Sequence, residues 1–327
     1  MANKDQRIMF VFPGQGAQYA GIGSDLYADF PVVRKVYEEA ADTLGYDIAK
    51  LSFDGPEEEL GLTRHTQPAL MTHEIACLEA FRELTASEVT PAMAAGHSLG
   101  EYTALVAAGV LSFADGLKLV QRRGELMGQH GDGGMLALGL TRDEAAPLAD
   151  RFYCEVASCN MPQQTVIGGR DVDLDALQAG LPEMYPRKRA TRLKTEGAFH
   201  TYLMVTAAQE FRSVLDAVEF APAEFSVLSN YTAVLHDDDQ AGIRTRLFFQ
   251  LFKPVNWVGC MQSAVADGVA AFIEFGGGIG AGEGPANKKA NLEAIIKRNL
   301  KALSHEADYL AVINDQSLKE AAAAQLG

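Results

Sequence analysis

The pentapeptide Gly96-His97-Ser98-Leu99-Gly100 has the residue types and the spacing of a nucleophilic catalyst. A Gly-x-Ser-x-Gly sequence between a strand and a helix permits a sharp turn that exposes the serine hydroxyl. An apolar run at residues 91–95 precedes it, and a helical pattern at 101–108 follows it. Backbone N–H groups at the start of that helix can receive an oxyanion. We therefore predict that Ser98 is a covalent catalyst rather than part of a glycine-rich loop.

A serine hydroxyl needs a general base at neutral pH, and the chain has seven histidines. His97 adjoins the serine, but neighbouring side chains on such a turn diverge. His130 and His236 fall in Gly- or Asp-rich loops and His305 near the C-terminal end, so we expect these three to be solvated. His200 follows a predicted insert, where the chain returns to the main domain and would face the cleft. His200 therefore ranks first as the base.

Composition limits the classes of function. The chain has 327 residues, 48% of them hydrophobic, which suffices for a large core and a smaller second unit. Its net charge of −15 argues against nucleic acid as a partner, and no apolar run reaches the roughly 18 residues of a membrane span. The four cysteines lack metal-ligand spacing, which favours buried free thiols in a cytoplasmic protein without a metal site. Any anionic ligand or partner would need a locally basic site.

Strands that alternate with helices predict a parallel sheet covered by helices on both faces. The first strand is expected at Ile8–Phe12 and the last at residues 270–275. The alanine-rich tail at 321–324 is expected to fray. Helices are expected at residues 25–44, 67–84 with Pro68 in the first turn, 101–108, 113–127 and 244–252.

Residues 130–197 follow a different order of strand, helix, strand, strand, helix and strand, which is typical of a ferredoxin-like unit. We therefore predict an α/β protein of two domains. Residues 1–129 and 198–327 would form a large α/β-hydrolase-like domain with a parallel sheet. Residues 130–197 would form a small ferredoxin-like insert, with a four-stranded antiparallel sheet packed over the mouth of the site.

Seven motifs occur in one order along the chain: Phe12-Pro13-Gly14-Gln15-Gly16-Ala17-Gln18, Thr66-Gln67-Pro68-Ala69-Leu70, Gly96-His97-Ser98-Leu99-Gly100-Glu101-Tyr102, Arg123-Gly124-Glu125-Leu126-Met127, Ala198-Phe199-His200, Ser229-Asn230-Tyr231-Thr232-Ala233 and Pro254-Val255-Asn256-Trp257. Together they resemble the malonyl-CoA:acyl-carrier-protein transacylase family, which includes free-standing acyltransferases of polyketide synthases. The resemblance covers the chain from about residue 8 to about residue 275.

The resemblance implies a role for each matching residue. Ser98 would attack the acyl thioester, and His200 would act first as base and then as acid. The backbone carbonyl of Asn256 would orient His200, so that the pair is a dyad. Backbone N–H groups of Gln15 and Leu99 would form the oxyanion hole.

Arg123 would bind the free carboxylate of a malonyl group through a bidentate pair, while the adjoining Arg122 would lie on the surface. The substrate pocket would include Gln67, His97, Phe199 and Asn160.

Substrate choice is partly indicated. Phe199 before the histidine and Leu99 after the serine resemble the malonyl-type pattern. Gly197, Thr201 and Tyr202 depart from that pattern, so an atypical extender such as hydroxymalonyl or aminomalonyl is an alternative.

We therefore expect an acyltransferase that moves a malonyl-type, dicarboxylic acyl group through a Ser98 acyl-enzyme in polyketide or fatty-acid biosynthesis. The donor would be coenzyme A or a carrier protein, and the acceptor would be the phosphopantetheine of an acyl carrier protein, free-standing or within a polyketide synthase. No cofactor is expected. An acyl hydrolase of the same fold is an alternative against which Arg123 argues, and a catalytically silent docking module is another against which Ser98 and His200 argue.

Overall fold

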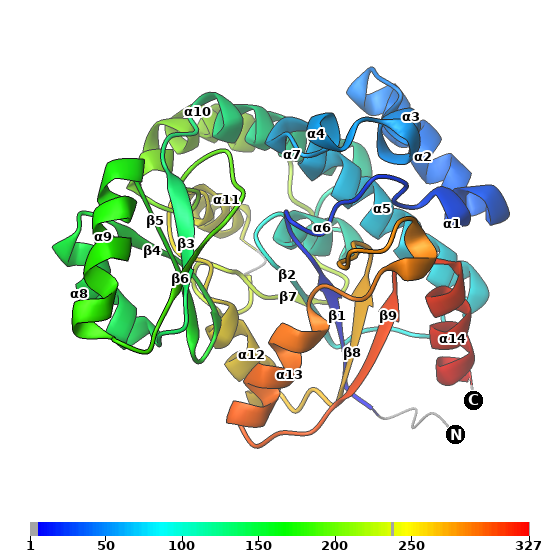
Figure 1. Cartoon of the computed structure of the whole chain (residues 1–327). Helices are drawn as coiled ribbons and strands as arrows, with labels where there is room; N and C mark the ends of the chain where they lie inside the picture. Colours follow the sequence, from blue (N-terminus) through cyan, green and yellow to red (C-terminus); the bar gives the residue numbers. More distant parts are fainter. Residues whose placement is uncertain (1–5, 237–238, 327) are drawn as a thin grey trace.

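The structure is a computed structural model of the chain and describes residues 6–236 and 239–326. Two sheets organise it (Figure 1). The larger has the strand order β7-β2-β1-β8-β9, and all neighbouring strands pair in parallel, as predicted. Its strands are β1 (Ile8–Phe12), β2 (Met93–Gly96), β7 (Ser226–Val227), β8 (Ala271–Phe275) and β9 (Asp308–Val312).

Helices cover both faces of this sheet because alternate residues of its strands are apolar on both sides. In β1, Ile8, Phe10 and Phe12 join one core, while Met9 and Val11 join the other. The first core is shared with α2 (Pro31–Leu44), α5 (Thr63–Leu84), α6 (Gly100–Ala107), α7 (Phe113–Gln129) and α10 (Val205–Asp216). The second is shared with α12 (Trp257–Ala266) and α13 (Glu293–Ala302).

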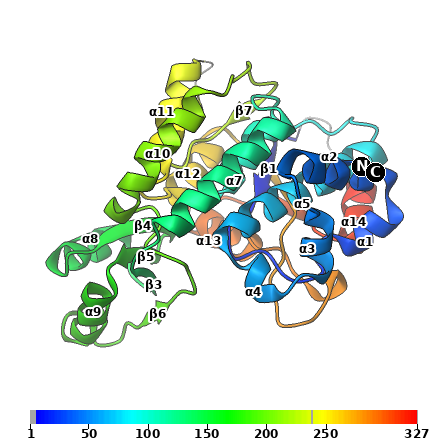
Figure 2. The same cartoon turned by 90° about the horizontal axis from the view of Figure 1, so that it is seen from above.

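The smaller sheet is antiparallel and has the order β4-β5-β3-β6. Its elements follow the predicted order along the chain: β3 (Gly134–Leu138), α8 (Arg142–Arg151), β4 (Glu155–Met161), β5 (Gln164–Gly169), α9 (Asp171–Met184) and β6 (Ala190–Arg192). Leu136 and Leu138 pack with α8 and α9, whereas Met135 and Val166 face away from those helices. Figure 2 shows this unit beside the large sheet and its helices. The boundaries at 129/130 and 197/198 stay a prediction about folding units.

Two helix predictions need correction near the N-terminus. The helix expected at residues 25–44 is two helices, α1 (Ser24–Asp29) and α2, because Phe30 is extended before Pro31. A residue before proline disfavours the helical conformation. The helix expected from residue 67 begins at Thr63, so Pro68 lies inside α5 rather than in its first turn. The short helices α3 (Ile48–Asp54) and α4 (Glu57–Leu60) connect α2 to α5.

The C-terminal part also differs from the prediction. Residues 270–275 are not the last strand, because β9 adds to the edge of the parallel sheet. The expectation of a frayed tail at 321–324 is wrong as well. These residues belong to α14 (Asp315–Leu326), whose Leu318, Ala321 and Ala322 are buried. The remaining helix of the main domain, α11 (Gln240–Gln250), precedes α12.

The four cysteines are buried free thiols, as predicted. Within residues 6–236 and 239–326, no helix is both long and apolar enough to cross a membrane.

Candidate active site

Ser98 lies at a sharp turn between β2 and α6, as its sequence context predicts. Its φ of 55° falls in the left-handed region, which side-chain-bearing residues rarely adopt. Glycine is required on both sides of it. A Cβ at Gly96 would lie 1.8 Å from the carbonyl carbon of Gly100, and one at Gly100 would lie 2.2 Å from the Phe12 carbonyl oxygen. The turn is therefore packed directly against the end of β1.

His200 lies in contact with the serine. The Oγ of Ser98 and the Nε2 of His200 are 2.7 Å apart, and Nδ1 of His200 donates to the Gln250 carbonyl at 2.7 Å. Since a carbonyl only accepts, Nδ1 carries the proton and Nε2 is free to accept one from the serine. Burial, together with the Arg123 cation, lowers the pKa of His200 to about 3. The imidazole is therefore neutral at neutral pH, which is the form that a general base needs.

The carbonyl that orients His200 belongs to Gln250 and not to Asn256, so that prediction is corrected. Asn256 instead begins α12, where its side chain accepts from Gly259 N at 3.1 Å and its carbonyl from Cys260 N at 3.0 Å. Gln250 is the last residue of α11. Carbonyls in the last turn of a helix lack intrahelical partners, which leaves the Gln250 oxygen available to His200.

Arg123 is fully buried beside the serine. Its Nη2 lies 3.2 Å from Ser98 Oγ, and its guanidinium donates to the amide oxygens of Gln67 at 2.9 Å and of Gln250 at 3.1 Å. All three acceptors are neutral. Within the described part of the chain, Nε has no partner and no carboxylate is hydrogen-bonded to this guanidinium. Burial lowers the pKa of Arg123, and an incoming carboxylate would offset this cost of desolvation.

A cavity of about 410 Å³ brings the predicted site residues together at the boundary of the two sheets. Met135 and Val166 of the small sheet form part of its wall. All predicted site residues except Asn256 line it: Gln15, Gln67, His97, Ser98, Leu99, Arg123, Asn160, Phe199 and His200. No group of three or more His, Cys, Asp or Glu among the described residues could hold a metal ion.

Two backbone amides in this cavity are suited to receive an oxyanion. Leu99 stands at the N-terminus of α6, and Gln15 lies in the turn after β1. Across residues 6–236 and 239–326, neither N–H has a hydrogen-bond acceptor. The two turns are close, because a Cβ at Gly14 would lie 2.3 Å from the His97 carbonyl oxygen. Free N–H donors at this place fit the predicted oxyanion hole.

His97 is oriented toward the small sheet. Its Nε2 lies 2.8 Å from Asn160 Oδ1, and Asn160 is in turn held by Asn299, whose Nδ2 donates to its carbonyl at 2.9 Å. Burial lowers the pKa of His97, so its ring is neutral. Since His97 is engaged with Asn160 and His200 with Ser98, the structure favours His200 as the base, as predicted.

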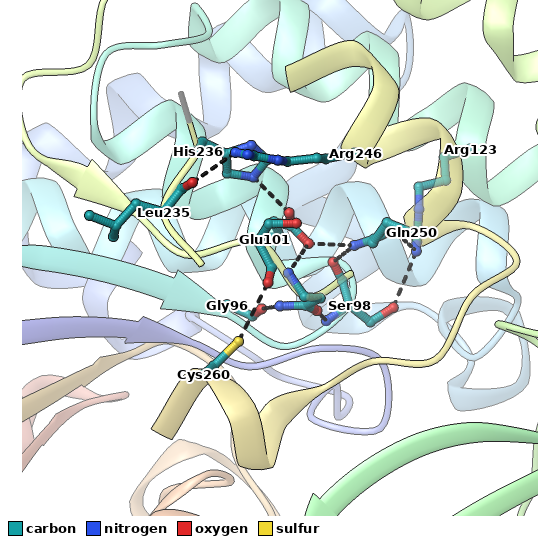
Figure 3. A network of polar contacts seen from close by, with 11 residues as sticks. Gly96, Ser98, Glu101, Arg123, Leu235, His236, Arg246, Gln250 and Cys260 are labelled. Carbon is teal, nitrogen blue, oxygen red and sulfur yellow. Dashed lines mark hydrogen bonds and ion pairs between the residues drawn. The ribbon is translucent and has the colours of Figure 1, made fainter. Parts of the chain in front are cut away.

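A buried polar network lies behind the serine turn (Figure 3). Ser98 N donates to Asn230 Oδ1 at 2.7 Å, and Asn230 Nδ2 donates to the Gly96 carbonyl at 2.7 Å. Gln250 Nε2 donates to the Ser98 carbonyl at 2.7 Å and to Glu101 Oε2 at 3.1 Å. Asn230 and Glu101 belong to the motifs of the family resemblance, but nothing in the sequence indicates Gln250.

His236 belongs to this network, so the expectation that it is a solvated loop residue is wrong. Its side chain is only 4% exposed, and its Nε2 lies 2.8 Å from Glu101 Oε1. His130 is also paired, at 2.9 Å from Glu210, but that pair is more exposed. The expectation that Arg122 lies on the surface is confirmed, because its half-exposed side chain pairs with Glu125.

Comparison with known proteins gives one family. The family described as acyl transferase domain matches residues 9–276. A malonyl CoA-acyl carrier protein transacylase of Bacillus subtilis (strain 168) is 38% identical over 323 residues, which are 96% of this chain and 98% of the relative. A protein of the same name from Staphylococcus aureus (strain MRSA252) is 38% identical over 82% of this chain and 88% of its own length.

Solved structures agree with these sequence matches. An acyl-carrier-protein S-malonyltransferase of Burkholderia pseudomallei 1710b has a TM-score of 0.86 at 36% identity, covering 97% of this chain and 99% of its own. A malonyl-transacylase in complex with its type II PKS acyl-carrier protein has a TM-score of 0.86 at 32% identity, with the same coverage.

Proposed function

This chain belongs to the acyl transferase domain family, and from that premise we propose that it transfers a malonyl group from coenzyme A to an acyl carrier protein, in fatty-acid or polyketide synthesis. The observation that carries the proposal is the buried Arg123 guanidinium, which among the described residues is hydrogen-bonded only to neutral acceptors and lies 3.2 Å from Ser98 Oγ. A malonyl carboxylate supplies the anionic acceptor that this cation lacks.

The first half-reaction forms an acyl-enzyme. Ser98 Oγ attacks the thioester carbonyl carbon while His200 Nε2 accepts the hydroxyl proton. The oxyanion accepts hydrogen bonds from the N–H groups of Gln15 and Leu99. When the C–S bond breaks, protonated His200 gives its proton to the leaving sulfur, so coenzyme A departs as a thiol and Ser98 carries a malonyl ester.

The second half-reaction is the reverse with a new thiol. His200 Nε2 accepts the proton of the carrier's phosphopantetheine thiol, and the sulfur attacks the ester carbonyl. The C–O bond breaks, and Ser98 Oγ recovers its proton from His200. The Gln250 carbonyl at the C-terminus of α11 stabilises the transient imidazolium, since this end of a helix carries partial negative charge.

The partner, the cofactors and the location are part of the same proposal. The relative solved with a type II PKS acyl-carrier protein supports a carrier protein as partner. Nucleophile, base, oxyanion donors and carboxylate-binding cation all come from the chain, so the proposed reaction uses no cofactor. The buried free thiols support a reducing compartment such as the cytoplasm.

Intact-protein mass spectrometry tests the proposal. Wild-type protein incubated with malonyl-CoA is expected to gain one malonyl group, which a phosphopantetheine-bearing carrier protein then removes. Ser98→Ala should gain none. Ser213→Ala is the matched control, because this serine is exposed on α10 and bonds only the Glu210 carbonyl. A malonyl adduct on Ser98→Ala would refute the nucleophile. Loss of the wild-type adduct to water, with none reaching the carrier, would indicate the hydrolase.

A further inference from the structure

We propose that His236 and Glu101 are a positioning pair that fixes the catalytic dyad and the carboxylate-binding arginine through Gln250. The inference rests on the proposed function and assigns a role to two buried ionisable side chains that neither line the active-site cavity nor contact the side chains of Ser98 and His200.

Glu101 is fully buried, and His236 lines a second hollow of about 250 Å³ that shares no residue with the active-site cavity. The side chains of His236 and Glu101 are 4% and 0% exposed, and Nε2 and Oε1 are 2.8 Å apart. The backbone of His236 is held as well, since its N–H donates to the Val227 carbonyl at the end of β7 at 2.7 Å. The other carboxylate oxygen of Glu101 accepts from Asn230 N and from Gln250 Nε2, each at 3.1 Å. Because the carboxylate of Glu101 is fully buried, its orientation depends on these three donors.

Glu101 influences the positions of His200 and Arg123 through Gln250. Because Nε2 of Gln250 donates to Glu101 and to the Ser98 carbonyl, the plane of its amide is fixed. The amide oxygen then accepts from Arg123 Nη2 at 3.1 Å, and the backbone carbonyl of the same residue accepts from His200 Nδ1. Figure 3 shows Gln250 between Glu101 and Arg123. A shift of Glu101 would therefore move the contacts of both Arg123 and His200.

Glu101 also influences the serine turn, through Asn230. Asn230, whose N–H donates to Glu101, accepts from Ser98 N and donates to the Gly96 carbonyl. These bonds hold Ser98 at its positive φ of 55°. Strained backbone persists only where its surroundings over-determine it. Glu101 thus anchors both branches of the network, and His236 is its only side-chain donor besides Gln250 within the described residues.

Removing the imidazole would leave Glu101 Oε1 buried without that donor, so the carboxylate would reorient. Because the network holds both His200 and Arg123, its loss should slow the chemical step and also weaken binding of the malonyl carboxylate. Misplacement of reacting groups costs up to about 100-fold in rate. We expect His236→Ala to lower kcat for malonyl transfer by about 10–100-fold and to raise KM for malonyl-CoA.

The experiment compares three variants at one position with a control elsewhere. The side-chain amide of His236→Gln reaches the position of Nε2 and can donate to Glu101, whereas that of His236→Asn is one methylene too short. The control is His130→Ala, which removes the more exposed His130–Glu210 pair and should leave kcat unchanged. Thermal unfolding of each variant shows whether it is folded at the assay temperature.

The proposal predicts slow turnover for His236→Ala and His236→Asn, and recovery of most of the rate in His236→Gln. It is overturned if His236→Ala unfolds at a lower temperature but keeps the wild-type kcat, or if His236→Gln is as slow as His236→Asn. The Gln and Asn comparison decides the question even if His236→Ala does not fold. If wild type fails to form a malonyl adduct, the proposed function fails separately, and the same ratios are measured with the acyl-CoA that wild type accepts.

Discussion

His200 illustrates how burial selects a base at the scale of a single residue. Its pKa lies at about 3, mainly through burial and secondly through the Arg123 cation. In the unfolded chain a histidine titrates near 6.5. As the pH falls below that value, His200 becomes protonated in the unfolded state but stays neutral in the folded state. His200 therefore lowers the free energy of unfolding progressively as the pH falls from about 6.5 to about 3. Above that range it contributes no pH dependence.

The low pKa of His200 predicts how the rate of Ser98 acylation depends on pH on the acid side. In wild type, Ser98 acylation by a neutral acyl-CoA such as acetyl-CoA should not decline through the ordinary histidine range, since His200 stays unprotonated. Arg123→Ala removes the cation that lowers the pKa of His200, so the acid limb should move to higher pH. Single-turnover acylation as a function of pH measures this, with circular dichroism at each pH as the check on folding. An acid limb at the same pH in both proteins would contradict the assigned cause.

Gln250 marks a limit of sequence reasoning at this scale. Ser98, His200 and Arg123 could be found because their side chains carry the chemistry and their motifs are specific. Gln250 orients His200 through a backbone carbonyl, which any residue could supply, so residue type gives no signal. The motif that contains Asn256 predicts that its carbonyl orients His200, but a position in a motif does not say which carbonyl a fold leaves free. His236 lies in a loop, as its sequence context predicts, but its side chain is buried because it pairs with Glu101 of α6, a tertiary contact that local sequence does not indicate.

The serine turn is the element on which the site depends most. A Cβ at Gly100 would meet the carbonyl oxygens of Phe12 at 2.2 Å and Pro13 at 2.6 Å, and neither backbone group can move freely. Gly100→Ala should therefore lower the free energy of unfolding by about 1–3 kcal/mol and slow the acylation of Ser98. Gly128→Ala on the helix α7 is the control, because the nearest neighbour of its Cβ outside that helix would be the Glu196 carboxylate, 3.8 Å away. There alanine should stabilise by about 0.5–1 kcal/mol.

Chemical denaturation of Gly100→Ala, Gly128→Ala and wild type measures these changes in the free energy of unfolding. Wild-type stability in Gly100→Ala would contradict the close packing of the turn against β1.

Elements with strong local patterns were predictable, and elements defined by tertiary contacts were not. β1 and the antiparallel unit have clear apolar alternation and turn signals. β9 is half-buried along most of its length and is a strand because it pairs with β8. The alanine run in α14 has little apolar contrast of its own and is ordered because Leu318, Ala321 and Ala322 pack into the core. The break between α1 and α2 occurs because Phe30 precedes Pro31. This local signal is present in the sequence, but the helical spacing of apolar residues across 25–44 predicts one continuous helix instead.

At the scale of the molecule, the two sheets together define the cavity. The serine turn follows the carboxyl end of β2, where ligands bind in open parallel sheets. Met135 and Val166 form a wall of the cavity. They lie on the face of the small sheet that α8 and α9 leave uncovered. Against a net charge of −15, the buried Arg123 provides a local cation at the point where an anionic acyl group would bind. The antiparallel order was predictable from the sequence, while the cavity depends on how that sheet packs against the larger one.

The central claim is that this cation binds the carboxylate of the transferred group, and Arg123→Ala tests it. In wild type, malonyl transfer to Ser98 should be strongly preferred over acetyl transfer. In the variant, a buried carboxylate without its partner costs about 3–5 kcal/mol, which corresponds to a factor of roughly 10² to 4 × 10³. An acetyl group carries no charge and loses nothing. Arg122→Ala, which removes the half-exposed neighbouring guanidinium, is the control and should keep the wild-type preference.

The most direct measurement is the ratio of malonyl to acetyl acylation rates of Ser98 in wild type, Arg122→Ala and Arg123→Ala. We predict that the ratio falls by a factor of roughly 10² to 4 × 10³ in Arg123→Ala alone, while the variant still acylates Ser98 with acetyl-CoA. An equal ratio in all three proteins would show that Arg123 does not bind the carboxylate and would contradict the account.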